Sequence, residues 1–190
     1  MRSLLKVLLC VTCALGLAAC VIYVTITQTG ETLSNGPWRT NLSTGSAAAG
    51  LLLRARVAWR GLWALQSSEV YYFSAKTDSD GEPLRHHCRY RVAGSDPDAR
   101  WWSVTAYNND HLIPNPRQTY SFSKTTVERE SNGSWVISFS RDPQPKNWLP
   151  SGDQDGELVL SLRCYNPGAE LMANPGEVEL PRIIREGCQE

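Results

Sequence analysis

The sequence predicts a mainly β protein: a jelly-roll-like β-sandwich preceded by one amphipathic helix and an N-terminal transmembrane helix. Three observations lead to this fold class. The chain begins with a long apolar run, helical spacing of apolar residues follows over residues 46–65, and beyond Glu69 the apolar period changes to two. The roughly 160 residues after the apolar run are enough for one domain with a sizeable core.

The apolar run extends from Leu4 to Ile26, and Lys6 is its only charged residue. A helix of about 20 residues crosses the roughly 30 Å hydrocarbon core of a bilayer, so residues 1–27 predict a membrane anchor. Arg2 and Lys6 flank the leading end, and the next basic residue is Arg39. The positive-inside rule therefore keeps the N-terminus cytoplasmic and exports the remainder of the chain.

Two other fates of this segment stay open. A basic start, an apolar stretch and small side chains also describe a cleavable signal. In addition, Leu17-Ala18-Ala19-Cys20 resembles a bacterial lipoprotein box, which would make Cys20 a lipidation site. Apolar residues continue to Ile26, beyond either cleavage position, and this favours the uncleaved anchor.

Residues 28–45 are rich in Thr, Ser, Gly and Asn, so they predict an extended tether. The domain is then expected over residues 46–188, opening with a helix over residues 46–65. We expect the apolar stripe of this helix to pack on the domain core, with contact between its arginines and lipid headgroups as the alternative. The stripe contains Leu51, Ala55, Ala58, Trp59, Leu62 and Leu65, and the arginines are Arg54, Arg56 and Arg60.

The strands expected after Glu69 alternate between apolar and polar residues, which gives each strand one buried and one wet face. The apolar positions include Trp102, Val104 and Ala106, Trp135, Ile137 and Phe139, and Leu158, Leu160 and Leu162. Turn sequences such as Asp78–Gly81 and Asp153–Gly156 separate the strands. Their D-x-D-G pattern resembles half of a calcium loop, but the remaining acidic ligands are missing, so we expect hairpin turns.

The charge composition restricts the possible partners, and the cysteines predict a disulfide. The chain has 19 basic and 19 acidic residues without a basic cluster interleaved with aromatics, which argues against a nucleic-acid partner. Cys88, Cys164 and Cys188 lie outside the apolar run. An oxidising compartment predicts one disulfide among them, and the residues alone leave all three pairings open.

No specific cofactor or metal motif occurs, so we expect neither a cofactor nor a metal. His86, His87 and Cys88 resemble ligands, but neighbouring strand residues point to opposite faces. Only His86 and Cys88, joined by His111, could then converge on one ion.

A candidate binding face lies on the strand around Trp101. Its outward positions combine aromatic rings with hydroxyl groups, and exposed rings can stack on sugars. We therefore place any ligand-binding cleft at Trp101 and Tyr107, with His111 nearby and Trp148 as a companion ring.

Several sequence strings resemble the family called domain of unknown function 1214, over about residues 35–188. They are Glu69-Val-Tyr-Tyr-Phe73, Trp101-Trp-Ser-Val-Thr-Ala-Tyr107, Lys146-Asn-Trp-Leu-Pro150 and Leu162-Arg-Cys-Tyr-Asn-Pro167. The resemblance implies a jelly-roll β-sandwich, often found behind a second β domain in longer bacterial proteins. The chain is similar to the short, membrane-anchored version, which implies a disulfide between Cys88 and Cys188 and a buried thiol at Cys164.

These observations together predict a membrane-anchored β-sandwich that acts as a binding or cell-envelope interaction module. We expect a single-pass protein of the bacterial inner membrane with a periplasmic domain and an envelope protein or glycan as partner. The alternative is an envelope enzyme acting on carbohydrate or a related polymer. For that chemistry, Glu69 or Glu128 could form a carboxylate pair with Asp142.

Overall fold

The computed structural model of this chain describes residues 2–28, 32–59 and 64–189, so Arg60 and Leu62 lie outside the described residues. It divides into two compact units. The first, which we call the N-terminal unit, consists of Met1–Glu31 and Ser43–Gln66; the second, the β unit, consists of Thr32–Leu42 and Ser67–Glu190.

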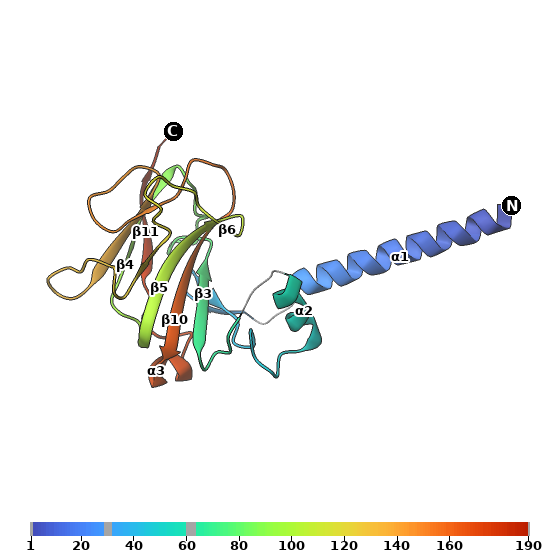
Figure 1. Cartoon of the computed structure of the whole chain (residues 1–190), viewed down its shortest axis with the longest axis horizontal. Helices are drawn as coiled ribbons and strands as arrows, with labels where there is room; N and C mark the ends of the chain where they lie inside the picture. The colour runs from blue at the N-terminus through green and yellow to red at the C-terminus, as the bar shows by residue number, and fades with distance from the viewer. Residues whose placement is uncertain (1, 29–31, 60–63, 190) are drawn as a thin grey trace. The chain divides into compact units, whose positions relative to one another are not determined.

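Helix α1, Arg2–Gln28, forms the first part of the N-terminal unit as one continuous helix (Figure 1). Its stretch Arg2–Thr25 is long and apolar enough to cross a bilayer, and its most apolar window is 0% buried. A signal sequence has the same properties. The Thr25 hydroxyl donates a hydrogen bond to the carbonyl of Val21 (2.7 Å), so this polar group is satisfied within the helix.

Helix α2, Leu51–Trp59, is shorter than the helix expected over residues 46–65. Ser46 precedes it in a local turn, in which the Ala48 N–H donates to Ser46 Oγ (3.1 Å), and such turns compete with helix formation. Leu53 is the one buried residue of α2, whereas Leu51 is 82% exposed and Trp59 70% exposed. The expectation of a buried stripe through Leu51 and Trp59 is therefore wrong, because helical spacing does not reveal what covers a stripe.

The larger sheet of the β unit has the strand order β1-β2-β3-β10-β5-β6, and β7 also pairs with β5. All of these pairings are antiparallel. The strands are β1 Leu33–Asn35, β2 Trp38–Thr40, β3 Val70–Ala75, β5 Ala99–Asn108, β6 His111–Leu112, β7 Ser121–Ser123 and β10 Leu158–Pro167. Strand β10 is central: its Leu162 lies opposite Phe73 on one side and Val104 on the other.

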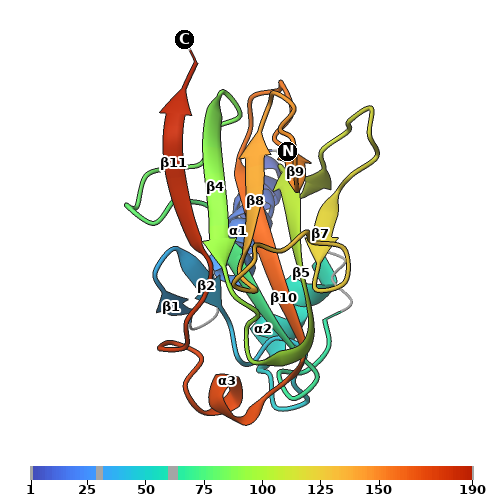
Figure 2. The same cartoon turned by 90° about the vertical axis from the view of Figure 1, so that its left-hand side faces the viewer.

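The smaller sheet has the order β11-β4-β8-β9 and lies in front of the larger one in Figure 2. Its strands are β4 Cys88–Gly94, β8 Trp135–Ser140, β9 Trp148–Pro150 and β11 Arg182–Cys188. The β8–β9 pair is parallel and the others are antiparallel. A short helix, α3 (Ala169–Ala173), lies between β10 and β11 in the chain.

The core lies between the two sheets and uses the apolar strand positions expected from the sequence. Trp102 of the larger sheet stacks on Trp135 of the smaller one, with ring centroids 4.5 Å apart, and both side chains are fully buried. The predicted fold class, mainly β with two packed sheets behind an N-terminal apolar helix, is therefore confirmed. The jelly-roll connectivity stays a prediction.

The tether predicted over residues 28–45 is wrong where β1 and β2 form a hairpin. The turn between them contains Gly36, whose φ of 58° suits glycine. Trp38 is 1% exposed, and its Nε1 donates to the carbonyl of Pro181 (2.7 Å). The polar composition of the segment concealed this single core residue.

Candidate functional site

Six side chains form what we call the outer face, on the side of the larger sheet away from the core. They are Trp101, Ser103, Thr105 and Tyr107 of β5, with Arg163 and Tyr165 of β10. Strand pairing sets Trp101 opposite Tyr165 and Ser103 opposite Arg163. The residues between them, such as Trp102 and Cys164, point into the core because side chains alternate along a strand.

Arg163 is held across this face by two hydrogen bonds. Its Nη1 donates to Thr105 Oγ1 (3.1 Å), and its Nη2 donates to the Tyr107 hydroxyl (2.7 Å). The guanidinium carbon also lies 5.7 Å from the centre of the Tyr107 ring, within cation–π range. Although Thr105 points outward, it is only 6% exposed. The guanidinium is thus fixed in one orientation before any ligand arrives.

An aromatic pair flanks this guanidinium. The rings of Trp101 and Tyr165 meet edge to face, with centroids 5.3 Å apart and an interplanar angle of 62°. Both side chains are half-buried, so part of each ring faces outward. Apolar ring faces beside a planar, multiple N–H donor suit a ligand that has both C–H surfaces and hydroxyl groups.

The four residues proposed for ligand binding do not all gather here. Trp101 and Tyr107 share the outer face, but His111 is the pairing partner of Asn108, whereas Tyr107 pairs with Leu112. Trp148 belongs to the smaller sheet and is 6% exposed. Its Nε1 donates to the Ser140 carbonyl (3.0 Å), so it acts as a packing residue.

Sequence reasoning missed Arg163 and Tyr165. Both occupy the outward parity of β10, and the alternation with Leu162 and Cys164 was visible in the sequence. The pairing of β10 with β5 was not visible, because strand order in a sheet depends on long-range contacts.

A cavity of about 310 Å³, which we call the His86 cavity, lies elsewhere in the β unit. Its lining includes four basic or imidazole side chains and two carboxylates: Lys76, Arg85, His86, His87, Asp155 and Glu157. Lys76 Nζ and Glu157 Oε1 lie 2.6 Å apart, and His86 Nδ1 and Asp155 Oδ1 lie 3.4 Å apart. The Asp155 side chain is fully exposed, so this cavity does not desolvate its acidic groups.

Among the described residues, the one ligand set that strand alternation would have allowed, His86, Cys88 and His111, does not come together. Strand β4 begins only at Cys88, so alternation does not apply to His86 and His87, whose ring centroids lie 5.2 Å apart. Instead, ligand atoms of His87, Cys88 and Cys188 lie within 4.8 Å of one another. Both sulfurs are in a disulfide, however, and metal binding by cysteine requires a thiolate.

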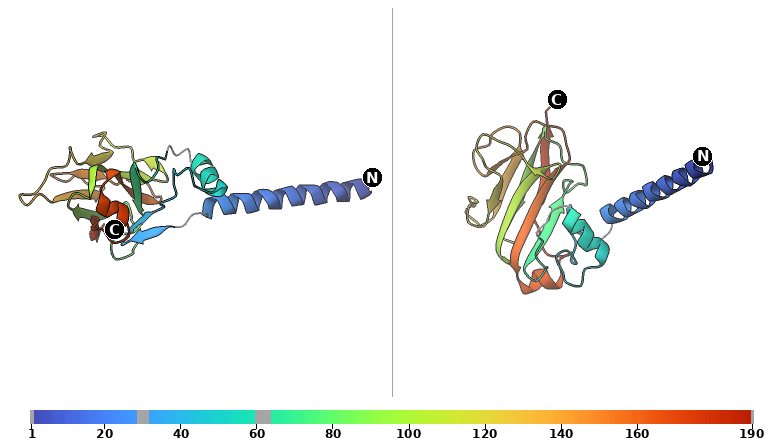
Figure 3. Two further views of the ribbon diagram at one scale, coloured as in Figure 1. Left: turned by 90° about the horizontal axis from the view of Figure 1, so that it is seen from below. Right: turned by 45° about the vertical axis from the view of Figure 1, so that its right-hand side comes forward.

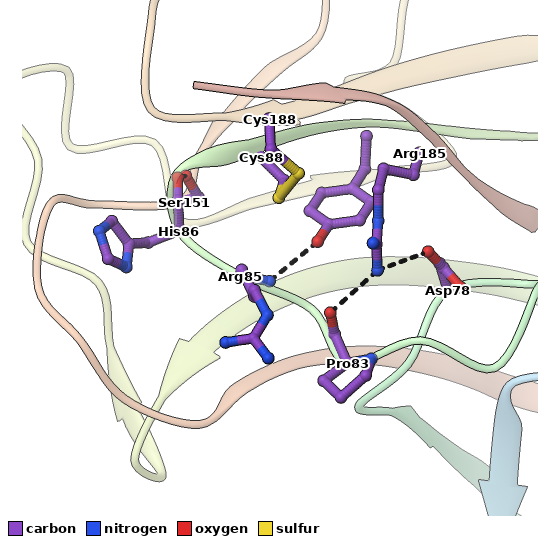
Figure 4. The surroundings of a disulfide bond; sticks show 9 residues. Asp78, Pro83, Arg85, His86, Cys88, Ser151, Arg185 and Cys188 are labelled. Atoms are coloured by element: carbon purple, nitrogen blue, oxygen red, sulfur yellow. Dashed lines mark hydrogen bonds and ion pairs between the residues drawn. A yellow bond between two sulfur atoms is a disulfide. The ribbon is translucent and has the colours of Figure 1, made fainter. Parts of the chain in front are cut away.

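This disulfide joins Cys88 and Cys188 at directly paired positions of β4 and β11 (Figure 4), which is the pairing that the family resemblance implied. It borders a second cavity of about 230 Å³, whose lining includes Arg141 and Asp142 but neither Glu69 nor Glu128. Cys164 is a free, buried thiol, and burial raises its pKa to about 12.

The fold and outer face together define a class: a two-sheet β domain with a preorganised aromatic and cationic surface, in a chain that begins with an apolar helix. The chain belongs to the family described as protein of unknown function (DUF1214), whose model matches residues 69–169. No curated protein matches it.

Among solved structures, the chain is similar to the VPA0106 protein from Vibrio parahaemolyticus, with a TM-score of 0.60 and 23% identity. The match covers 74% of this chain and 36% of that protein, so the chain spans about a third of its length. A protein from Burkholderia cenocepacia has a TM-score of 0.38 and 18% identity over 62% of this chain and 29% of its own. The likeness to the Vibrio protein supports the β fold.

Proposed function

We propose that this protein is a membrane-anchored, exported β-sandwich that binds a carbohydrate or related polymer of the cell envelope on its outer face. The observation that carries the proposal is the fixing of Arg163 by Thr105 and Tyr107 beside the Trp101–Tyr165 pair. Each element of this arrangement has a role in sugar recognition: the rings stack on C–H surfaces, and the guanidinium donates to hydroxyl or carboxylate oxygens.

Location is proposed from the two units separately. The apolar residues of α1 favour a membrane anchor over residues 1–27, with Arg2 and Lys6 on the cytoplasmic side. The disulfide of the β unit favours an oxidising compartment, such as the periplasm of a bacterium. Cleavage as a signal and lipidation at Cys20 stay as alternatives. Fractionation combined with N-terminal mass analysis separates the three outcomes.

Preorganisation makes the outer face a better binding site than loose surface side chains. Immobilising a rotamer-rich side chain costs about 0.5–1.5 kcal/mol on binding, and Arg163 is already ordered in the free protein. Trp101 and Tyr107 lie six residues apart on one strand, which spans about 20 Å at roughly 3.3 Å per residue. A face of this length suits several units of an extended polymer better than a single small molecule.

Binding to isolated envelope polymers and soluble oligosaccharides tests the proposal. We expect Trp101→Ala and Arg163→Gln each to weaken binding by about tenfold, which corresponds to about 1.4 kcal/mol. Arg89→Gln is the matched control, because Arg89 lies on the smaller sheet and its side chain is 53% exposed. Retained binding in both outer-face variants, or the same loss in the control, would overturn the outer face as the site.

The second candidate function is an envelope enzyme acting on carbohydrate at the His86 cavity. The contact between His86 and Asp155, with Glu157 in the same lining, favours it. Two features argue against it: Asp155 is solvated, and Glu157 is neutralised by Lys76. Turnover of an envelope polymer by the wild type that disappears in both His86→Ala and Glu157→Gln would favour the enzyme over the binding module.

A further inference from the structure

We propose that α2 lies in the lipid headgroup layer of the membrane that α1 crosses, as an interfacial helix. This inference rests on the membrane anchor of the proposed function and adds a second contact between chain and bilayer. It concerns only the N-terminal unit, which contains both helices.

The composition of this segment fits an anionic lipid surface. Between Ser43 and Gln66 the sequence contains three arginines, Arg54, Arg56 and Arg60, and no aspartate or glutamate. The whole chain has equal numbers of basic and acidic residues, so this concentration of positive charge is local. Basic residues near an anionic leaflet each contribute attraction that decays within a Debye length of the surface.

Four large apolar side chains of this segment are turned outward, although Leu53 is buried. Leu51 is 82% exposed, Leu52 42%, Trp59 70% and Leu65 50%. A nine-residue helix is too short to be stable in water by itself, so α2 needs an apolar surface to bury such side chains. The headgroup and acyl boundary of a bilayer provides that surface for amphipathic helices.

The contact between Tyr23 and Trp59 would place α2 at the depth of the lipid headgroups when α1 spans the bilayer. Figure 3 shows α2 beside the C-terminal end of α1. Tyr23 lies near that end of α1, and its ring centroid is 6.2 Å from that of Trp59, the last residue of α2. Tyrosine and tryptophan concentrate at the membrane–water interface, where amphipathic rings sit at headgroup level. If α1 spans the bilayer, Tyr23 lies at its exit, and Trp59 lies at the same level.

Lipid is favoured over a protein partner because this surface is continuous with the membrane span. Tyr23 belongs to the apolar helix, Trp59 contacts it, and the exposed Leu51 and Leu52 lie on the same short helix as Trp59. The positive charge without acidic residues also matches the charge of anionic headgroups.

Quenching by brominated lipids tests this inference on the full chain reconstituted into vesicles. We expect brominated phosphatidylglycerol vesicles to quench tryptophan emission, and Trp59→Phe to remove a large part of that quenching. Trp101→Phe, which alters a tryptophan of the β unit, is the matched control and should leave the quenching unchanged.

Charge reversal tests the role of the headgroups. Arg54→Glu should lower the equilibrium constant for α2 lying in the headgroup layer of anionic vesicles by about fivefold or more, since each basic residue near the surface contributes about 1 kcal/mol. In phosphatidylcholine vesicles the same variant should have little effect. Arg39→Glu is the control, because Arg39 is an exposed arginine of the β unit.

Alkaline extraction of the same vesicles separates the anchor from the interfacial helix. If the chain resists extraction but Trp59→Phe leaves the quenching unchanged, the interfacial role of α2 is overturned and the anchor stands. If the chain is released by alkali, the anchor itself fails, and the inference fails with it. Quenching lost in Trp101→Phe to the same extent as in Trp59→Phe also contradicts the inference.

Discussion

Asp78, in the loop after β3, forms a buried ion pair with Arg185 of the last strand, with Oδ2 and Nη2 3.0 Å apart. Asp78 is 2% exposed, and its other oxygen accepts hydrogen bonds from the backbone N–H groups of Asp80 (3.1 Å) and Glu82 (2.9 Å). Arg185 also donates to the Pro83 carbonyl (3.2 Å), as Figure 4 shows. One carboxylate therefore shapes its own turn and ties that turn to strand β11.

Replacing Asp78 by Ala should lower the free energy of unfolding by about 3 kcal/mol. The change leaves Arg185 without its buried carboxylate partner and frees two turn N–H groups, and breaking a buried pair from one side costs about 3–5 kcal/mol. The lower end applies because the Arg185 side chain is 27% exposed. Chemical denaturation of the purified chain measures the loss. Asp80→Ala, at an exposed position of the same turn, should change stability by less than about 0.5 kcal/mol.

Loss of the disulfide should also destabilise the β unit. Cys88 and Cys188 are separated by 100 positions in the chain, and cross-linking a loop of that length restricts the unfolded state by up to about 4–5 kcal/mol. We expect Cys188→Ser, or the wild type in a reducing agent, to lose about 2–5 kcal/mol in urea denaturation. If the reductant destabilises Cys188→Ser as much as the wild type, a linkage other than Cys88–Cys188 is responsible for the loss of stability.

Asn147→Asp, a nearly isosteric change, should also lower the free energy of unfolding. Its Nδ2 donates to the carbonyls of Glu128 (2.8 Å) and Val136 (2.9 Å), while its Oδ1 accepts from the Glu128 N–H (2.8 Å). In Asn147→Asp a carboxylate oxygen would face two carbonyl oxygens in a site that is 5% exposed. We expect a loss of about 2–4 kcal/mol at pH 7, since one oxygen of this buried charge would face carbonyl oxygens and have no donor.

Protonation of the introduced carboxyl group provides the control for Asn147→Asp. The protonated acid can donate one hydrogen bond, so part of the lost stability should return as the pH falls from 7 towards 4. A variant that is equally unstable at both pH values would contradict this explanation. Denaturation curves of the wild type at the same pH values correct for other titrating groups.

Local alternation in the sequence was enough to predict the strands and their buried faces. Predictions from the sequence failed where contacts between distant segments determine which residues are buried or paired. The apolar positions around Trp102 and Trp135 are in the core, because strand periodicity identifies a buried face without knowing its partner. The same reasoning could not reveal that Trp38 fills the core from a polar hairpin. It also treated Asp78–Gly81 correctly as a turn, yet missed Arg185, a partner that lies over a hundred positions further along the chain.

The candidate site shows the same limit. Trp101 and Tyr107 were predictable as outward residues of one strand, because they share a parity. Their neighbours Arg163 and Tyr165 depend on the pairing of β5 with β10, which no local pattern encodes. Trp148 was proposed for the site because it is aromatic, but tertiary packing buries it in the other sheet.

Cys164 should make the stability of the protein fall between pH 9 and pH 10. Its side chain is fully buried, and burial raises its pKa from an ordinary value of 9.0 to about 12 in the folded protein. In this pH range the unfolded thiol loses its proton while the folded thiol keeps it. The unfolded state then binds fewer protons, so the free energy of unfolding decreases as the pH rises.

The expected decrease from this one group is about 1 kcal/mol between pH 9 and pH 10, since one full proton corresponds to about 1.4 kcal/mol per pH unit. Burial also raises the pKa of Tyr71 and Tyr90 from 10.0, so their contributions have the same sign but begin at higher pH. Urea denaturation of wild type and Cys164→Ala at pH 8, 9 and 10 isolates the thiol, with non-reducing gels to verify that no disulfide exchange has occurred. The variant should lose less stability than the wild type over this range, and parallel losses would mean that the buried thiol is not the group responsible.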